Sequence, residues 1–174
     1  MTRTIAVAAA LAAILMAGCR PIAGVKQRLG WPKPVNPAAL TVVGFNVESG
    51  DAAPAYLARE QFAPAEGVDL WGLSEVRPGW LEVLQLGAAA GEGTDYSAVL
   101  GTTGGDDRLA ILYNPARLTL VVTDELQGAS FEGVRAPLIA QFQRQGSSQQ
   151  FLFMVNHLYR SNEQKRHQQA ELIN

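Results

Sequence analysis

Four polar residues of this chain are of types that can bind a metal ion and a phosphate group. Asn46 and Glu75 each close a strongly apolar segment, and an amide oxygen or a carboxylate suits a hard divalent cation such as Mg²⁺. His157 closes a third apolar segment and can donate a hydrogen bond to developing negative charge. Arg135 precedes a fourth, and a guanidinium binds phosphate through paired hydrogen bonds.

Each of the four also has an ordinary structural interpretation. Asn46 can cap a turn at the end of a strand, and Glu75 can be an exposed loop acid. His157 can be a hydrogen-bonded structural histidine, and Arg135 can be a surface arginine. Taken alone, none of them predicts a functional site. Whether they form one depends on the secondary-structure elements that position them.

The composition is that of a folded domain. The chain has 174 residues, of which 48% are apolar and 17% charged, so it can bury a core of ordinary size. The net charge is −2 and there is no polybasic run. General electrostatic attraction to nucleic acid or anionic lipid is therefore not expected, although a local pocket can still be basic.

The first residues resemble an export signal. Arg3 is followed by an uncharged apolar run over residues 5–17, which is too short to span a bilayer comfortably. Cys19, the only cysteine, directly follows this run in a pattern similar to a bacterial lipobox, except that Met16 stands where leucine is usual. We expect a signal peptide over 1–18 and lipidation of Cys19; plain cleaved secretion and a retained anchor are the alternatives.

A tether and one domain follow the signal. Residues 19–39 are rich in proline and glycine, which resist regular structure, and the domain is predicted over 40–174. Strand-like and helix-like stretches alternate, and some consecutive strands are expected to be antiparallel. Ser161 is the predicted N-cap of the last helix. The predicted strands are 40–46, 69–74, 96–100, 109–113, 118–123, 138–143 and 151–157, and the predicted helices are 54–62, 78–90 and 161–174.

The order of these motifs resembles the endonuclease/exonuclease/phosphatase superfamily, which includes deoxyribonuclease-I-like nucleases. The resemblance covers about 40–174 and implies an α/β (α+β) four-layer sandwich of two packed mixed β-sheets with outer helices, of which this chain holds the N-terminal portion. The matching segments are the strand ending in Asn46, the strand ending in Glu75, Arg108–Asn114, Arg135–Pro137, Asn156-His157, and the helix with Arg166, Gln169 and Ala170.

The resemblance also implies roles for the candidate residues. Glu75 would be a ligand of Mg²⁺, or of another hard cation such as Mn²⁺ or Ca²⁺, with Asn46 beside it in the metal or phosphate shell. His157 would contact the scissile phosphate, and Arg135 would lie near that phosphate. Arg108 is a weaker candidate. Arg166 and Gln169 would belong to a helix that packs the scaffold, and His167 to the surface.

Two later motifs of the superfamily, Gly-Asp-x-Asn and Ser-Asp-His, are absent from the sequence. By resemblance they would complete the groups that activate water, so about half of the constellation is present. Because catalytic groups act as a unit, we expect the 174-residue chain alone to be inactive. It would also expose a sheet face and a strand edge, which favours aggregation.

The function expected from the sequence is an exported, lipid-anchored, metal-dependent hydrolase of phosphate esters in the envelope of a bacterium. Nucleic acid and phospholipid or small phosphoesters are both open as substrates. The lipid anchor would make the membrane a partner, and no obligate protein partner is evident. The rival is a non-catalytic envelope lipoprotein that keeps the fold as a binding module.

Overall fold

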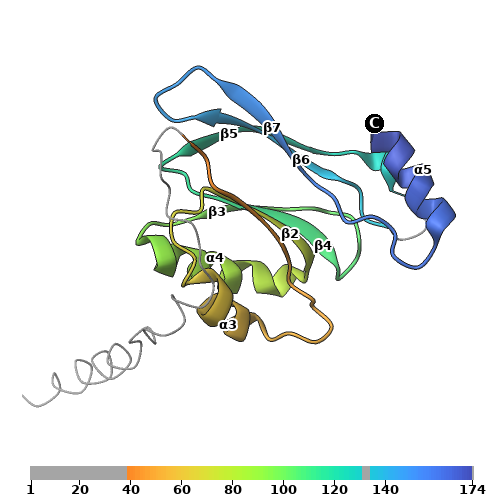
Figure 1. Ribbon diagram of the computed structural model, residues 1–174, viewed down its shortest axis with the longest axis horizontal. Coiled ribbons are helices and arrows are strands. Elements are labelled where there is room, and N and C mark those ends of the chain that lie inside the picture. Colours follow the sequence, from red (N-terminus) through yellow and green to blue (C-terminus); the bar gives the residue numbers. More distant parts are fainter. Residues whose placement is uncertain (1–38, 131–133, 174) are drawn as a thin grey trace, which may run out of the picture. The chain divides into compact units, whose positions relative to one another are not determined.

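A computed structural model describes residues 39–130 and 134–173, which all lie within one compact unit (Figure 1). The predicted signal peptide, Cys19 and almost the whole of the predicted tether lie outside the described residues. Within the described ranges, no helix is long and apolar enough to cross a bilayer.

The first sheet is mixed and has the strand order β1-β2-β4-β3. Strands β1 (Val42–Asn46) and β2 (Leu70–Val76) run parallel, and Asn46 is paired with Ser74. Strand β4 (Arg108–Tyr113) is antiparallel to β2 and to β3 (Ser97–Leu100). The parallel pair brings the C-terminal ends of β1 and β2 to one edge of the sheet.

Helices cover the outer face of this sheet. Helix α3 (Pro54–Leu57) continues as a π-helix over Ala58–Phe62, and a 3₁₀ turn at Pro78–Trp80 leads into α4 (Leu81–Glu92). Gly91 lies within α4, and the left-handed Gly93 (φ 66°) ends it, because glycine adopts this conformation without a steric penalty.

The helices pack closely on one another and on the sheet. A Cβ added at Gly87 of α4 would lie 2.7 Å from the Cα of Ala58, so glycine is what allows the two helices to approach. Beneath them, the rings of Phe62 and Trp71 stack with their centroids 4.4 Å apart. Both side chains are fully buried in the apolar cluster between helices and sheet.

The second sheet has the order β5-β6-β7 and is antiparallel among the described strands. Its strands are β5 (Leu118–Glu125), β6 (Leu138–Arg144) and β7 (Gln150–Val155). In β6, the buried residues Leu138, Ala140 and Phe142 alternate with less buried ones, as the period of two requires. The second core cluster lies between the sheets and comprises Leu70, Leu109, Ile111, Leu118, Leu138, Ala140, Phe142 and Val155.

A short 3₁₀ turn over Gln127–Ala129 and helix α5 (Glu163–Ile173) complete the described structure, and the two are in contact. The cap of α5 is Asn162 and not Ser161 as predicted. The Asn162 side chain accepts a hydrogen bond from the backbone N–H of Lys165 at 3.0 Å, so the helix begins one residue later. The predicted α/β arrangement of two packed sheets with helices is confirmed.

Candidate metal and phosphate site

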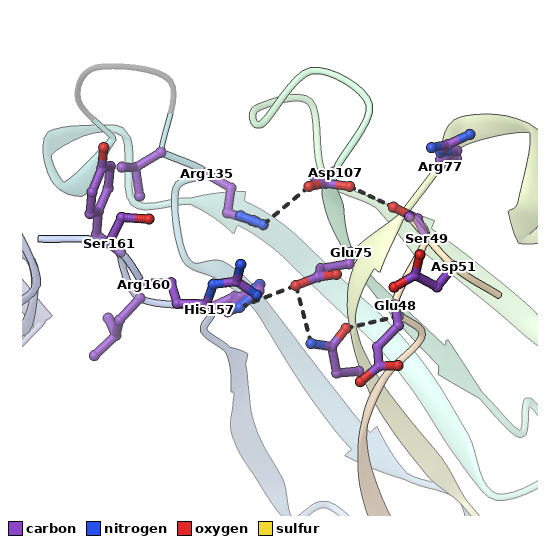
Figure 2. A pocket seen from close by; sticks show the side chains of 15 residues that line it. Glu48, Ser49, Asp51, Glu75, Arg77, Asp107, Arg135, His157, Arg160 and Ser161 are labelled. Atoms are coloured by element: carbon purple, nitrogen blue, oxygen red, sulfur yellow. Dashed lines mark hydrogen bonds and ion pairs between the residues drawn. The ribbon is translucent and has the colours of Figure 1, made fainter.

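The strand ends of β1 and β2 open into a cavity of about 720 Å³. Figure 2 shows Glu75, His157 and Arg135 projecting toward one another within it. The fold therefore brings together all four of the residues selected from the sequence, although they are spread over more than a hundred positions. The lining residues are Asn46, Glu48, Ser49, Gly50, Asp51, Glu75, Arg77, Asp107, Val134, Arg135, His157, Leu158, Tyr159, Arg160 and Ser161.

Asn46 and Glu75 are joined directly. The Asn46 amide donates a hydrogen bond to Oε1 of Glu75 at 3.1 Å, and its oxygen accepts one from the backbone N–H of Glu48 at 3.0 Å. Glu75 has φ 60° and lies in an irregularity of β2 between Leu73 and Val76. A left-handed conformation is unusual for a residue other than glycine, and here it accompanies a carboxylate that faces the cavity.

His157 lies beyond the end of β7, next to Glu75. Its Nε2 is 3.6 Å from Oε1 of Glu75, and both side chains are about one-fifth exposed. Burial, followed by the positive charge of Arg135, lowers the pKa of His157 below its ordinary value, although Glu75 acts in the opposite direction. The ring is therefore neutral at pH 7, and its buried Nδ1 has no hydrogen-bond partner among the described residues.

Arg135 is held in the lining of the cavity by a chain of polar contacts. Its Nη2 lies 3.7 Å from Oδ2 of Asp107, and Oδ1 of Asp107 accepts a hydrogen bond of 2.6 Å from Ser49 (Figure 2). The guanidinium Nε is buried without a hydrogen-bond partner among the described residues. Because an unpaired buried donor costs about 1–3 kcal/mol, this nitrogen is suited to an oxyanion that enters the cavity.

The loop between β3 and β4 shapes this side of the cavity. Gly104 has φ 91°, and a Cβ there would lie 2.9 Å from the Cβ of Arg135 and 2.5 Å from the carbonyl oxygen of Asp107. The hydroxyl of Thr103 in the same loop accepts a hydrogen bond of 2.8 Å from the backbone N–H of Ala136. The loop thus contacts the backbone beside Arg135 as well as its side chain.

Glu125, at the end of β5, holds this loop in place. Its carboxylate accepts hydrogen bonds from the backbone N–H and the hydroxyl of both Thr102 and Thr103. Partial burial acts to raise the pKa of Glu125, but these hydrogen bonds outweigh it and hold the pKa below its ordinary value. The ionised carboxylate is therefore the form that the folded loop favours.

This gives a pH-dependent contribution to stability. Because the pKa of Glu125 is lower in the folded chain than in the unfolded chain, where it is about 4.3, its contribution is complete above that pH and is lost as the pH falls. We expect Glu125→Gln to lower the free energy of unfolding by about 1 kcal/mol at pH 7 and by much less near pH 3. Urea denaturation at both pH values measures this, with Asp124→Asn as the neighbouring control. An equal loss at both pH values would contradict the assignment.

The oxygen atoms of Glu75 and Asn46 suit a hard cation that the protein encloses only in part. No three acids, histidines or cysteines among the described residues converge as a ready cation site. Glu75 and Asn46 offer one carboxylate and one amide oxygen, and the contacts of Glu75 with Asn46 and His157 are both made by its Oε1. Mg²⁺ commonly binds one or two carboxylates and fills its remaining positions with water and substrate phosphate, so the residues fit such an ion.

Most of the lining residues were not identified from the sequence, and Asp107 and Ser49 are examples. Asp107 and Ser49 lie in loops without any motif, and only the fold brings them together across 58 positions. Arg108, the weaker candidate, is not a lining residue: it donates hydrogen bonds to the carbonyl oxygens of Gly105 and Gly101 and so supports the loop. His167 is exposed, as expected.

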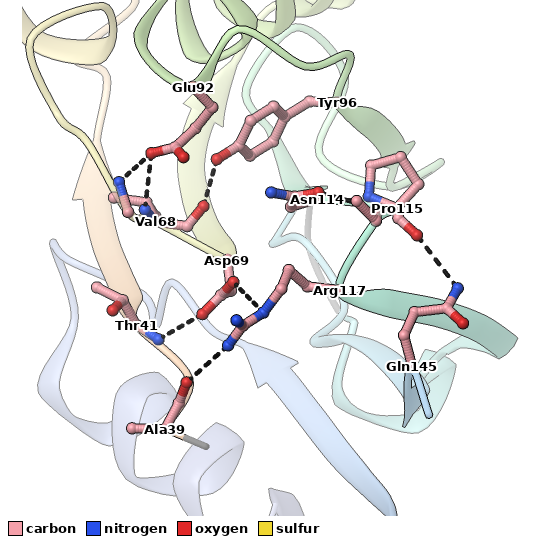
Figure 3. A network of polar contacts seen from close by, with 12 residues as sticks. Ala39, Thr41, Val68, Asp69, Glu92, Tyr96, Asn114, Pro115, Arg117 and Gln145 are labelled. Atoms are coloured by element: carbon pink, nitrogen blue, oxygen red, sulfur yellow. Dashed lines mark hydrogen bonds and ion pairs between the residues drawn. The ribbon is translucent and has the colours of Figure 1, made fainter. Parts of the chain in front are cut away.

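A second polar cluster, at the opposite end of β2, is structural (Figure 3). The buried carboxylate of Asp69 accepts a hydrogen bond from the backbone N–H of Thr41 at 2.9 Å and pairs with Arg117 at 3.2 Å. Arg117 also donates to the carbonyl oxygen of Ala39. Nearby, Tyr96 donates to the carbonyl oxygen of Val68, and burial raises the pKa of Tyr96. These groups satisfy one another and tie the start of β1 to β2 and β5.

Comparison with solved structures shows that the fold of this chain is similar to that of an endonuclease/exonuclease/phosphatase family protein. D. rerio TDP2 complexed with single strand DNA product is 22% identical with a TM-score of 0.57, and an endonuclease/exonuclease/phosphatase family protein from Bacteroides thetaiotaomicron is 20% identical with a TM-score of 0.58. A functionally unknown conserved protein from Enterococcus faecalis is 19% identical with a TM-score of 0.61.

Each of these similarities covers 77% of this chain and only 52–58% of the solved structure. The chain thus spans little more than half the length of the proteins it resembles. No protein-family model matches the sequence, and no curated protein is significantly similar to it. The superfamily resemblance of the sequence is therefore confirmed at the level of the fold.

Proposed function

We propose that this chain supplies the metal-binding and phosphate-binding groups of an exported, divalent-cation-dependent phosphodiester hydrolase. The observation that carries the proposal is a pair of buried nitrogen atoms, Nε of Arg135 and Nδ1 of His157, which have no hydrogen-bond partner among the described residues and belong to residues that line one cavity with Glu75. Buried polar atoms without partners are rare in folded proteins. Two of them beside a carboxylate suit a ligand with several oxygen atoms, as a phosphodiester has.

Each side chain then has a defined task. Glu75 and Asn46 would hold the cation, which when bound would stabilise negative charge on the phosphate oxygens. Arg135 would bind a non-bridging oxygen through its unpaired Nε. The neutral ring of His157 would donate a hydrogen bond from one of its nitrogens to a phosphate oxygen. Glu75 would compete little for this donor, because the 3.6 Å between Nε2 of His157 and Oε1 of Glu75 exceeds hydrogen-bond distance.

Nucleic acid is the substrate class that we propose. Arg77 and Arg160 both line the cavity, and Figure 2 shows them on opposite sides of Glu75. This spacing of cations suits a polyanion with phosphates on both sides of the cleaved one. The neighbour D. rerio TDP2, which was solved with a single strand DNA product, supports the same class.

The test uses the complete product of the gene that encodes this chain. We expect Mg²⁺-dependent cleavage of an end-labelled single-stranded oligonucleotide, and at least tenfold slower hydrolysis of a dispersed glycerophospholipid. Faster hydrolysis of the phospholipid would contradict nucleic acid as the substrate class, but it would still support metal-dependent phosphodiester hydrolysis. Phosphate binding without hydrolysis of either substrate would favour the non-catalytic binding module. Export and the lipid anchor at Cys19 remain predictions from the sequence, which membrane fractionation tests.

A further inference from the structure

Gln169 is a fully buried polar residue on a helix that is otherwise largely exposed. It lies in α5, it is 1% exposed, and no other residue of that helix is buried. Its side chain does not line the cavity. A buried amide without a structural or functional reason would weaken the fold, because polar groups cost free energy when they leave water.

The amide of Gln169 joins three separate backbone segments. Its oxygen accepts a hydrogen bond from the backbone N–H of Tyr159 at 3.0 Å. Its nitrogen donates to the carbonyl oxygens of Ala129 at 3.3 Å and Arg135 at 3.2 Å. Only an amide side chain offers both a donor group and an acceptor at this length, so neither glutamate nor an apolar residue can replace all three bonds.

Two of the three segments carry cavity-lining residues. Arg135 supplies the guanidinium nitrogen that has no hydrogen-bond partner among the described residues, and Tyr159 follows His157 and Leu158 in the lining of the same cavity. Arg166, one turn earlier in α5, donates hydrogen bonds to the carbonyl oxygens of Tyr159 and Arg160. Helix α5 therefore ties the backbone of the Arg135 segment to the backbone of the segment that follows His157.

The backbone beside Arg135 is held from two directions. Gln169 binds the carbonyl oxygen of Arg135, while Thr103 binds the N–H of the next residue, Ala136. Within the described part of the chain, the guanidinium itself has one ion pair, at 3.7 Å from Asp107. The location of this side chain is thus set mainly through its backbone, of which Gln169 fixes one side.

We infer that Gln169 is a positioning residue, which acts through Arg135 and sets the position of the Arg135 segment relative to the segment that follows His157 in the phosphate site. The inference rests on the proposed function, since it assumes that Arg135 binds phosphate. It assigns to Gln169 a role beyond packing of the scaffold helix. Its signature is coupling between Gln169 and Arg135 in phosphate binding.

A double-mutant cycle tests this coupling in the complete gene product. We measure the affinity for inorganic phosphate, with Mg²⁺ present, for the wild type, Gln169→Met, Arg135→Ala and the double variant. Gln169→Met keeps the length of the side chain and removes its hydrogen bonds. We expect it to weaken phosphate binding roughly tenfold in the wild-type background and less than twofold in the Arg135→Ala background, as residues that act through one another do.

Gln168→Met is the matched control, because Gln168 is the exposed neighbour in α5, and it should leave the affinity unchanged. Equal losses in both backgrounds would show a general structural effect and overturn the inference alone. Wild-type protein that does not bind phosphate would overturn the proposed function first, and the inference with it.

A measurement on the wild type covers the case in which Gln169→Met does not fold. Because coupling between sites is reciprocal, phosphate binding should strengthen the bond between Gln169 and the Tyr159 N–H. We expect phosphate to slow hydrogen exchange at the Tyr159 amide at least threefold. Slower exchange confined to the residues around Arg135, with Tyr159 unchanged, would contradict the inference.

Discussion

Replacing Glu75 with glutamine is expected to lower the Mg²⁺-dependent rate of phosphodiester cleavage by roughly 10²–10³-fold, the range seen when one preorganised electrostatic group is removed. Glu75 is the acid that contacts both Asn46, at 3.1 Å, and His157, at 3.6 Å. Glutamine keeps the size of the side chain and removes the charge that would hold the cation. The measurement is kcat/KM for an oligonucleotide across a Mg²⁺ titration.

Glu82→Gln is the matched control for this variant. Glu82 is an exposed acid in the first turn of α4 and does not line the cavity, so its replacement should leave the rate unchanged. Circular dichroism of both variants checks that the fold is retained. Full activity in Glu75→Gln would rule out the metal assignment, even if other variants in the cavity were inactive.

Replacing Trp71 with alanine is expected to lower the free energy of unfolding by about 3–5 kcal/mol, as removal of a large buried aromatic side chain commonly does. Trp71 is 1% exposed and stacks on Phe62, which is itself fully buried. Alanine would leave a cavity between the helices and the first sheet. Since whole domains are commonly stable by only about 5–15 kcal/mol, this variant should be close to unfolding at 37 °C.

Urea denaturation followed by circular dichroism measures the effect without depending on tryptophan fluorescence. Leu86→Ala is the control, because Leu86 lies in α4 but is 64% exposed, and its replacement should change the stability by less than about 0.5 kcal/mol. A loss below about 1 kcal/mol in Trp71→Ala would contradict the assignment of this cluster as the core that supports the site.

The fold and the centre of the site could be predicted because both depend on local patterns. Short apolar runs indicate buried strands, and a polar residue at the end of such a run lies at a sheet edge. Strands β1 and β2 are parallel, so their C-terminal ends meet, and this places Asn46 beside Glu75. The order of the motifs then indicated the superfamily fold, which the sheet topology confirms.

The rest of the site depends on contacts between distant segments, which a single sequence does not reveal. Asp107 stands in a glycine-rich loop and has no motif, yet it pairs with Ser49 and Arg135. Gln169 stands in a polar helix without apolar periodicity, so the pattern alone does not indicate which of its side chains are buried. Its burial follows from backbone groups of three loops that only the folded chain brings within hydrogen-bond distance.

The left-handed backbone at Glu75 has a consequence for how this protein can change. A non-glycine residue in that conformation costs about 1–2 kcal/mol, so the molecule gives up stability to aim one carboxylate into the cavity. Glycine at this position would relieve the backbone and delete the acid in a single step. If the proposed function holds, selection for stability and selection for catalysis act in opposite directions on residue 75, which makes it a point of stability–activity trade-off.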